Sequence, residues 1–232
     1  MCGIVGYIGD QEAEDLLLTG LKRLEYRGYD SAGLATVDES GLHVQKREGK
    51  VDDLRNSLDS APMPGTTGIG HTRWATHGAP NDVNAHPHVS TDGSFALVHN
   101  GIIENHGVLK KKLKEKGYTF QSDTDTEVLV YLIEEVKRAA DLSLPEAVRQ
   151  ALTQVIGAYG IAIVSGEDPD LLIAARNGSP LILGVGEDEY FIGSDAAPLV
   201  EHTRQVVYLE DGEMATLRRS GYNVTTIDNE PL

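Results

Sequence analysis

The chain opens with MCGIVGYI, residues 1–8, in which apolar residues and two glycines follow a cysteine. Such a stretch is typical of a short buried strand, with glycines where neighbouring backbones come close. Cys2 is the only cysteine in the 232 residues and stands directly behind Met1, where a small side chain usually permits removal of the methionine. We therefore expect Cys2 to become the first residue of the mature chain and to begin a strand of the core.

Beyond this first strand, the hydrophobic pattern predicts consecutive strands with helices grouped between them. Helices are expected over residues 12–25, 52–58, 108–116, 125–138 and 145–156, with a short helix near residue 196. Strands are expected over residues 2–8, 33–38, 42–48, 68–72, 95–100, 160–164, 171–175, 181–185, 190–193, 205–209, 213–217 and 222–227. Hairpin-length turns join most of the strands, which indicates an α+β fold with antiparallel sheets. No repeat or linker divides the sequence, so residues 1–232 are expected to form a single domain.

Composition narrows the classes of partner. A formal net charge of -16 repels phosphate backbones and anionic lipid, so we expect neither nucleic acid nor a membrane surface as a partner. No apolar run approaches the roughly 20 residues that cross a bilayer, and the first residues lack the pattern of a secretory signal. A single cysteine cannot form an intrachain disulfide, which suits a reducing compartment. The sequence predicts a cytoplasmic protein that acts on a small molecule or another protein.

A cysteine at a mature N-terminus carries two chemical groups in one residue. Its thiol is a nucleophile, and its free α-amine, with a pKa near ~7.7, accepts a proton close to neutral pH. Position alone also allows a cysteine without a catalytic role behind the initiator methionine. Other motifs must therefore decide between these two interpretations of Cys2.

The run HTRWATHG, residues 71–78, is too polar for a core and too aromatic for an ordinary solvated turn. Loops of this kind usually bind something. Arg73 can hold a carboxylate with two hydrogen bonds, and Trp74 beside it can cover a bound ligand and exclude water. A structural loop with a cation–π contact is the alternative.

Histidines follow in NAHPH, residues 84–88, and with His71 and His77 they raise the possibility of a zinc or copper site. Cys2 is the only thiolate available and no close Cys/His ligand spacing is present, so hydrogen-bonding histidines in a pocket wall are favoured over a metal. We expect neither a metal nor a cofactor.

Two further segments contain polar groups at the ends of predicted elements. His99-Asn100-Gly101 ends a strand with an amide donor beside a glycine N–H, the pair that an oxyanion hole requires, although Asn-Gly is also a common hairpin turn. Asp125 lies where a helix begins, which helix capping and the helix dipole explain, or which could serve a ligand ammonium group. Arg73 and Asp125 together would supply the two charges that hold a free α-amino acid.

Six segments, in this order, resemble the motifs of the class II glutamine amidotransferases, the glutaminases with an N-terminal nucleophile. The segments are MCGIVG (1–6), LEYRGYDSAG (24–33), HTRWATHG (71–78), NAHPH (84–88), VHNG (98–101) and SDTDTE (122–127). The resemblance covers essentially the whole chain. It implies a four-layer αββα sandwich of two antiparallel sheets, the fold of N-terminal-nucleophile hydrolases.

The resemblance also implies roles for individual residues. Cys2 would be the nucleophile with its own α-amine as base, and the Asn100 side chain with the Gly101 N–H would form the oxyanion hole. Arg73 would bind the α-carboxylate of L-glutamine and Asp125 its α-ammonium. The remaining expected site residues are Trp74 on a closing loop, Thr76, His77 and His86 in the pocket wall, and Arg27 and Gly28 near the nucleophile.

Residues 26–30 and 73–78 resemble the branch of the family that supplies ammonia to fructose 6-phosphate for the synthesis of glucosamine 6-phosphate. Members of that branch carry a sugar-phosphate isomerase part, which is absent from this chain, so an excised domain of a homo-oligomeric enzyme is expected. The alternatives are the glutaminase parts of amidophosphoribosyltransferase or asparagine synthetase, an N-terminal-nucleophile hydrolase of other amides, and a non-catalytic amino-acid-binding module.

Overall fold

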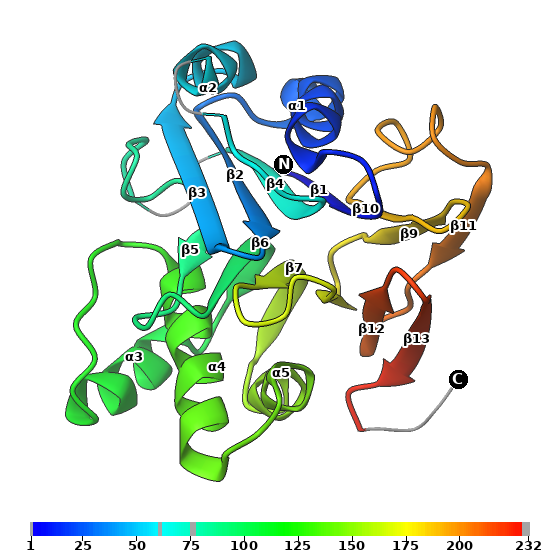
Figure 1. Ribbon diagram of the computed structural model, residues 1–232. Coiled ribbons are helices and arrows are strands. Elements are labelled where there is room, and N and C mark those ends of the chain that lie inside the picture. Colours follow the sequence, from blue (N-terminus) through cyan, green and yellow to red (C-terminus); the bar gives the residue numbers. More distant parts are fainter. Residues whose placement is uncertain (1, 60–61, 75–77, 229–232) are drawn as a thin grey trace.

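The computed structural model describes residues 2–59, 62–74 and 78–228, which form two stacked antiparallel sheets (Figure 1). The seven-stranded sheet has the order β11 (Gln205–Tyr208), β9 (Ile182–Val185), β10 (Tyr190–Gly193), β1 (Gly3–Ile8), β4 (Thr67–Arg73), β2 (Ser31–Asp38), β3 (Gly41–Glu48). The six-stranded sheet has the order β13 (Gly221–Thr226), β12 (Glu213–Arg218), β8 (Leu172–Asn177), β7 (Gly157–Ser165), β6 (Phe95–Ile103), β5 (His88–Val89). Strand β1 therefore lies inside its sheet, with β10 on one side and β4 on the other.

Helices cover the outer face of each sheet, as Figure 1 shows. The seven-stranded sheet packs against α1 (Ala13–Leu24) and α2 (Val51–Leu58), and the six-stranded sheet packs against α3 (His106–Glu115), α4 (Asp125–Ala140) and α5 (Leu144–Leu152). The inner faces of the two sheets share a third apolar cluster. The expected α+β fold with a four-layer αββα arrangement is therefore confirmed.

Strand β1 shows how the sequence produces these layers. Successive side chains of a strand point to opposite faces. Ile4 and Ile8 accordingly join the cluster between the sheets, whereas Val5 and Tyr7 pack in the cluster that includes α1. Gly3 faces the end of α1, and a Cβ atom there would lie 2.7 Å from Leu24 Cβ. This alternation of side chains therefore buries both faces of β1. Gly3, the first residue of the strand, leaves room for α1 to pack close to it.

The start of α4 is fixed by side-chain caps. Thr124 is the N-cap, and its Oγ1 accepts a hydrogen bond from the Glu127 N–H at 3.3 Å. The Glu127 carboxylate accepts from the backbone N–H groups of Gln121 and Ser122, at 2.9 Å and 2.8 Å, rather than from Thr124 as a capping box would have it. These bonds fix the backbone on both sides of Asp125, the first residue of the helix.

The elements differ from the expected ones at several places. The predicted short helix near residue 196 is wrong, because only two N–H groups, those of Leu199 and Val200, bond to the Ala196 carbonyl before the chain turns again. A short 3₁₀ helix, η1 (Glu25–Arg27), follows α1. Strand β6 continues to Ile103, so the Asn-Gly pair lies within a strand and is not a hairpin turn.

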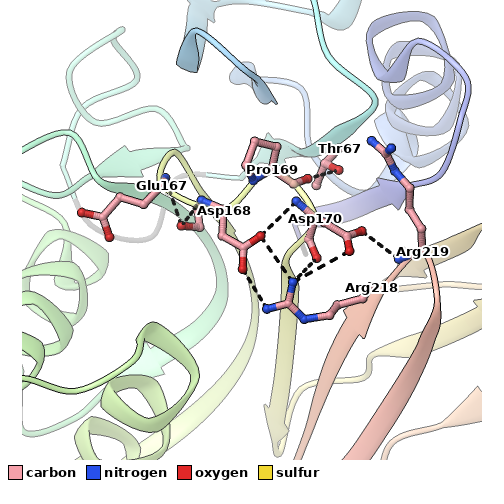
Figure 2. A network of polar contacts seen from close by, with 8 residues as sticks. Thr67, Glu167, Asp168, Pro169, Asp170, Arg218 and Arg219 are labelled. Atoms are coloured by element: carbon pink, nitrogen blue, oxygen red, sulfur yellow. Dashed lines mark hydrogen bonds and ion pairs between the residues drawn. The ribbon is translucent and has the colours of Figure 1, made fainter.

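A polar network holds the loop between β7 and β8, as Figure 2 shows. Arg218, the last residue of β12, forms an ion pair with Asp168 in which Nη2 lies 2.7 Å from Oδ2. In the same loop the Pro169 carbonyl accepts a hydrogen bond of 2.6 Å from Thr67 Oγ1. Thr67 is the first residue of β4 and Arg73 the last. The network therefore ties the two sheets together at the end of β4 opposite Arg73.

Candidate active site

Cys2 lies immediately before β1, beside the end of β4. Gly3 pairs with Thr72 across the two strands, which brings the thiol to the peptide that follows β4. The Trp74 N–H donates to Cys2 Sγ at 3.2 Å, and Sγ lies 3.6 Å from the Trp74 carbonyl. Burial raises the pKa of the Cys2 thiol above its ordinary value, and the Trp74 N–H opposes that rise. The resting side chain is accordingly a protonated thiol near neutral pH.

Asn100 reaches Cys2 from the other sheet, and Gly101 follows it in the same strand. Asn100 Nδ2 donates to the Cys2 carbonyl at 3.2 Å, so β6 of one sheet meets the start of β1 in the other. Gly101 has φ +132°, a backbone conformation that glycine adopts readily, and a Cβ atom there would overlap the Ala158 carbonyl. The conformation and the space both require glycine at this position.

Arg73 and Asp125 provide opposite charges in the same region. Arg73 is 4% exposed, and its guanidinium donates to the carbonyls of Gly78 and Ala79, each at 3.4 Å. Asp125 is 7% exposed, and its Oδ2 accepts the Ile103 N–H at 2.8 Å. Buried charges are costly unless they are hydrogen-bonded, and both of these are. Each side chain is thus held in one orientation by backbone groups.

A cavity of about 320 Å³ joins these groups. It is lined by Cys2, Arg27, Arg73, Trp74, His86, His99, Asn100, Gly101, Ile102, Thr124, Asp125, Thr126, Ser179 and Pro180. Small-molecule sites in proteins begin at about 300 Å³, so the cavity suits a compact metabolite. Eight of the expected site residues line it. Two others, Thr76 and His77, lie outside the described residues.

Gly28, the remaining expected site residue, lies behind the cavity wall. A Cβ atom on Gly28 would lie 2.7 Å from the Arg73 carbonyl carbon and 3.0 Å from the Trp74 nitrogen. The glycine therefore allows the backbone of residues 73–74 to pass close by, and that backbone carries the N–H bonded to the thiol.

The side chains around Gly28 include an ion pair and an exposed aromatic pair. Arg27 Nη1 lies 3.0 Å from Asp195 Oδ2, which holds the guanidinium at the cavity. Trp74 is 49% exposed, and its ring meets Tyr29 edge to face with centroids 5.6 Å apart. Trp74 thus lines the cavity while about half of the residue stays exposed to solvent.

Four histidines are buried beside the cavity. Burial lowers the pKa of His71 to about 3, and it lowers the pKa values of His86 and His88 well below their ordinary range. The pKa of His99 is lowered by the same cause. All four rings are therefore neutral near pH 7.

Two of these histidines bond to threonine hydroxyl groups at the start of α4. His88 Nε2 lies 3.0 Å from Thr124 Oγ1, and His99 Nδ1 lies 3.0 Å from Thr126 Oγ1. These contacts attach the histidines to the first turn of α4. Among residues 2–59, 62–74 and 78–228, no group of three His, Cys, Asp or Glu side chains is placed to hold a metal ion.

Six lining residues were not predicted from the sequence: His99, Ile102, Thr124, Thr126, Ser179 and Pro180. The first four lie next to predicted residues, so neighbouring positions in the same motifs were a usable signal. Ser179 and Pro180 belong to the turn between β8 and β9, and their only signal was the turn composition itself. Nothing in that turn indicates that it lines the cavity.

Comparison with known proteins identifies the family of this chain. Residues 71–201 match the family described as "Glutamine amidotransferase domain". This match covers more than half of the chain, and the chain belongs to that family.

Two curated relatives are similar to nearly the whole chain. The chain is 57% identical over 233 residues to glutamine--fructose-6-phosphate aminotransferase [isomerizing] of Chlorobaculum tepidum, covering 99% of this chain and 38% of the relative. It is 58% identical over 229 residues to the protein of that name from Bacteroides thetaiotaomicron, covering 98% and 37%. The chain thus spans less than two fifths of the length of these relatives.

A solved structure shares the fold. Glutamine phosphoribosylpyrophosphate amidotransferase from B. subtilis superposes with a TM-score of 0.85 at 29% identity, over 97% of this chain and 49% of the other. The two-sheet arrangement is therefore that of a glutaminase domain with an N-terminal nucleophile.

Proposed function

We propose that this chain hydrolyses the side-chain amide of L-glutamine to L-glutamate and ammonia through a γ-glutamyl thioester on Cys2. The proposal rests on one observation. A half-buried thiol, an amide donor, a buried guanidinium and a buried carboxylate line a single cavity, and they belong to Cys2, Asn100, Arg73 and Asp125. The membership of the chain in the glutamine amidotransferase family supports the same reaction.

The charges of the cavity fit a free α-amino acid. Arg73 would bind the α-carboxylate of glutamine, since a guanidinium can donate two parallel hydrogen bonds to one carboxylate. Asp125 would bind the α-ammonium. The side-chain amide would then point at Cys2, with His86, Thr76 and His77 in the wall and Trp74 over the mouth. Arg27 would border the substrate, and Gly28 would support the backbone at Arg73.

The raised pKa of the Cys2 thiol means that the nucleophile needs a base. We assign that task to the α-amine of Cys2 after Met1 has been removed. The amine takes the thiol proton, and sulfur adds to the Cδ carbonyl of glutamine. The oxyanion accepts hydrogen bonds from Asn100 Nδ2 and the Gly101 N–H. The ammonium returns the proton to the leaving nitrogen, and ammonia departs.

The second half-reaction consumes water. The same amine takes a proton from a water molecule, whose oxygen adds to the thioester carbonyl. The tetrahedral intermediate collapses, and sulfur leaves as the thiol after receiving the proton. Glutamate is released and the enzyme returns to its starting state. One glutamine and one water give one glutamate and one ammonia.

The relatives suggest a use for the ammonia. Their name, glutamine--fructose-6-phosphate aminotransferase, supports the proposal that residues 1–232 act as one glutaminase domain within a longer enzyme that aminates fructose 6-phosphate. The identity to these relatives is about twice that to the phosphoribosylpyrophosphate amidotransferase structure, so the sugar-phosphate branch is favoured. A homo-oligomer in the cytoplasm is part of the same proposal. None of the described helices is long and apolar enough to span a membrane.

Glutamate production by the purified chain tests the proposal, after intact mass has shown that Met1 is absent. The matched variants are Cys2→Ala, which should abolish turnover, and Asn100→Ala, which should lower kcat by about 10²- to 10³-fold, or ~2.7–4 kcal/mol of transition-state stabilisation. Bound glutamine with no turnover in the processed wild-type chain would instead indicate a non-catalytic amino-acid-binding module. An Asn100→Ala variant with unchanged kcat would refute the oxyanion assignment.

A further inference from the structure

The ring of His71 connects the two sheets directly behind the amide of Asn100. His71 lies in β4 and is 0% exposed. Its Nε2 lies 3.0 Å from Asn100 Oδ1, 3.2 Å from the His99 carbonyl oxygen and 3.2 Å from His86 Nδ1. One ring nitrogen of His71 thus meets three polar atoms, and one of them belongs to the proposed oxyanion donor.

The surroundings of His71 fix its tautomer. One neighbour of Nε2, the backbone carbonyl oxygen of His99, can only accept a hydrogen bond, whichever way the Asn100 amide is turned. A second, His86 Nδ1, is within 3.5 Å of the His99 N–H, which donates to it, so it is also an acceptor. Nε2 of His71 therefore carries a hydrogen. Burial keeps the ring neutral by lowering its pKa to about 3, so Nδ1 carries none.

The tautomer of His71 in turn fixes the orientation of the Asn100 amide. The oxygen Oδ1 faces the Nε2–H of His71, and the nitrogen Nδ2 faces the Cys2 carbonyl at 3.2 Å. Rotating the amide by half a turn would set two donors against each other at His71 and two acceptors against each other at Cys2. The amide nitrogen has two hydrogens, and only one is used by the Cys2 carbonyl. The other is available to the cavity.

We propose that His71 is a positioning residue that holds the Asn100 amide with its N–H directed at the oxyanion formed on Cys2. The inference rests on the proposed glutaminase function and adds a residue that does not line the cavity. During the reaction the oxyanion attracts the second hydrogen of Nδ2, while the donor at Oδ1 prevents the amide from turning. Preorganised donors of this kind need no rearrangement as charge develops.

A second observation supports a functional reason for the histidine. Its Nδ1 is buried and has no hydrogen-bond partner among the described residues. A buried polar atom without a partner destabilises the folded state, so packing alone would favour an apolar side chain at this position. The Nε2–H, which an apolar residue lacks, is the feature that the site uses.

A matched pair of substitutions separates the donor from the rest of the ring. In His71→Gln the side-chain amide nitrogen can occupy the place of Nε2, whereas in His71→Asn the shorter chain reaches only the place of Nδ1. Both variants are neutral, polar and smaller than histidine. We expect His71→Asn to lower kcat for glutamine hydrolysis about 10- to 100-fold, part of the loss seen when an oxyanion donor is deleted. KM should change less than about threefold, and His71→Gln should recover most of kcat.

A double-mutant cycle distinguishes positioning from a general structural effect. In the Asn100→Ala background no amide remains to be oriented, so His71→Asn should cause no further loss of kcat. Unfolding curves for each variant check that the fold is retained. Equal losses in the two backgrounds, or equal kcat values for the Gln and Asn variants, would overturn the assignment of His71. Absence of glutamate production by the processed wild-type chain would instead remove the proposed function itself.

Discussion

Substitution of Gly28 by alanine tests whether the backbone of residues 73–74 determines the state of the thiol. The new Cβ atom would lie 2.7 Å from the Arg73 carbonyl carbon, 2.8 Å from its oxygen and 3.0 Å from the Trp74 nitrogen. All three are backbone atoms, so no flexible side chain can yield. The peptide must move away from Gly28, and with it the N–H that donates to Cys2 Sγ at 3.2 Å.

The magnitude of this effect has two parts. Forcing one methyl group into a packed region costs about 1–3 kcal/mol, while alanine regains about 0.4–1 kcal/mol by restricting the unfolded chain. The free energy of unfolding should therefore fall by about 0–2.6 kcal/mol. At the thiol, weakening a hydrogen bond to the charged form by about 1 kcal/mol lowers the thiolate fraction about fivefold. The pKa of the Cys2 thiol, already raised by burial, should rise further.

Alkylation by iodoacetamide measures this directly, because Cys2 is the only cysteine in the chain. At pH 8 the rate for Gly28→Ala should be about fivefold below that of the wild type, with a loss of kcat in the same direction. Gly107→Ala is the matched control, since nothing lies within 4 Å of its added Cβ atom. That variant should be as stable as the wild type or more so, with unchanged alkylation. Gly28→Ala with a wild-type alkylation rate would refute the argument that this glycine acts through the Trp74 N–H.

Two further predictions concern charge. Asp125→Asn keeps an oxygen for the Ile103 N–H but loses the charge. The KM for L-glutamine should rise about 30-fold or more, while kcat changes less than about threefold. An unchanged KM in steady-state assays would refute the assignment of Asp125 to the α-ammonium. Burial lowers the pKa of His71 to about 3 in the folded protein, so the unfolded chain binds more protons at acid pH. The stabilisation that is present above about pH 6.5 is therefore lost as the pH falls. His71 alone should lower the free energy of unfolding by about 2 kcal/mol between pH 7 and pH 5, and a flat urea-unfolding profile over that interval would show that its ring is not buried in the neutral form.

The helices and strands could be predicted because most of them bury one face. The helix expected over residues 125–138 is α4 (Asp125–Ala140), and the strand expected over residues 68–72 is β4 (Thr67–Arg73). The two-residue strand β5 was missed, since two residues are too few to show a period. The order of strands in the sheets could not follow from periodicity. Strand β1 pairs with β10, about 185 residues further along the chain, and no local pattern records such a partner.

The candidate site could be predicted in its residues but not in its connections. Motif by motif, the sequence indicated Cys2, Arg73, Asn100 and Asp125, and all four line the cavity. The contact between His71 and Asn100 depends on how the two sheets stack, which sequence spacing does not reveal. For the same reason the sequence indicates His71 only as a possible metal ligand or a member of a pocket wall, and not as a partner of the amide.

The position of Cys2 has a practical consequence for handling the protein. Because β1 lies between β10 and β4 and Cys2, the residue before it, forms part of the cavity wall, any affinity tag or reporter fused ahead of Cys2 would be attached at that wall. Strand β13 is the outer edge of the other sheet, with three strands between it and β6, and a fusion or surface attachment after it would leave the cavity open. Immobilised or labelled versions of this chain should therefore be attached through the C-terminal side.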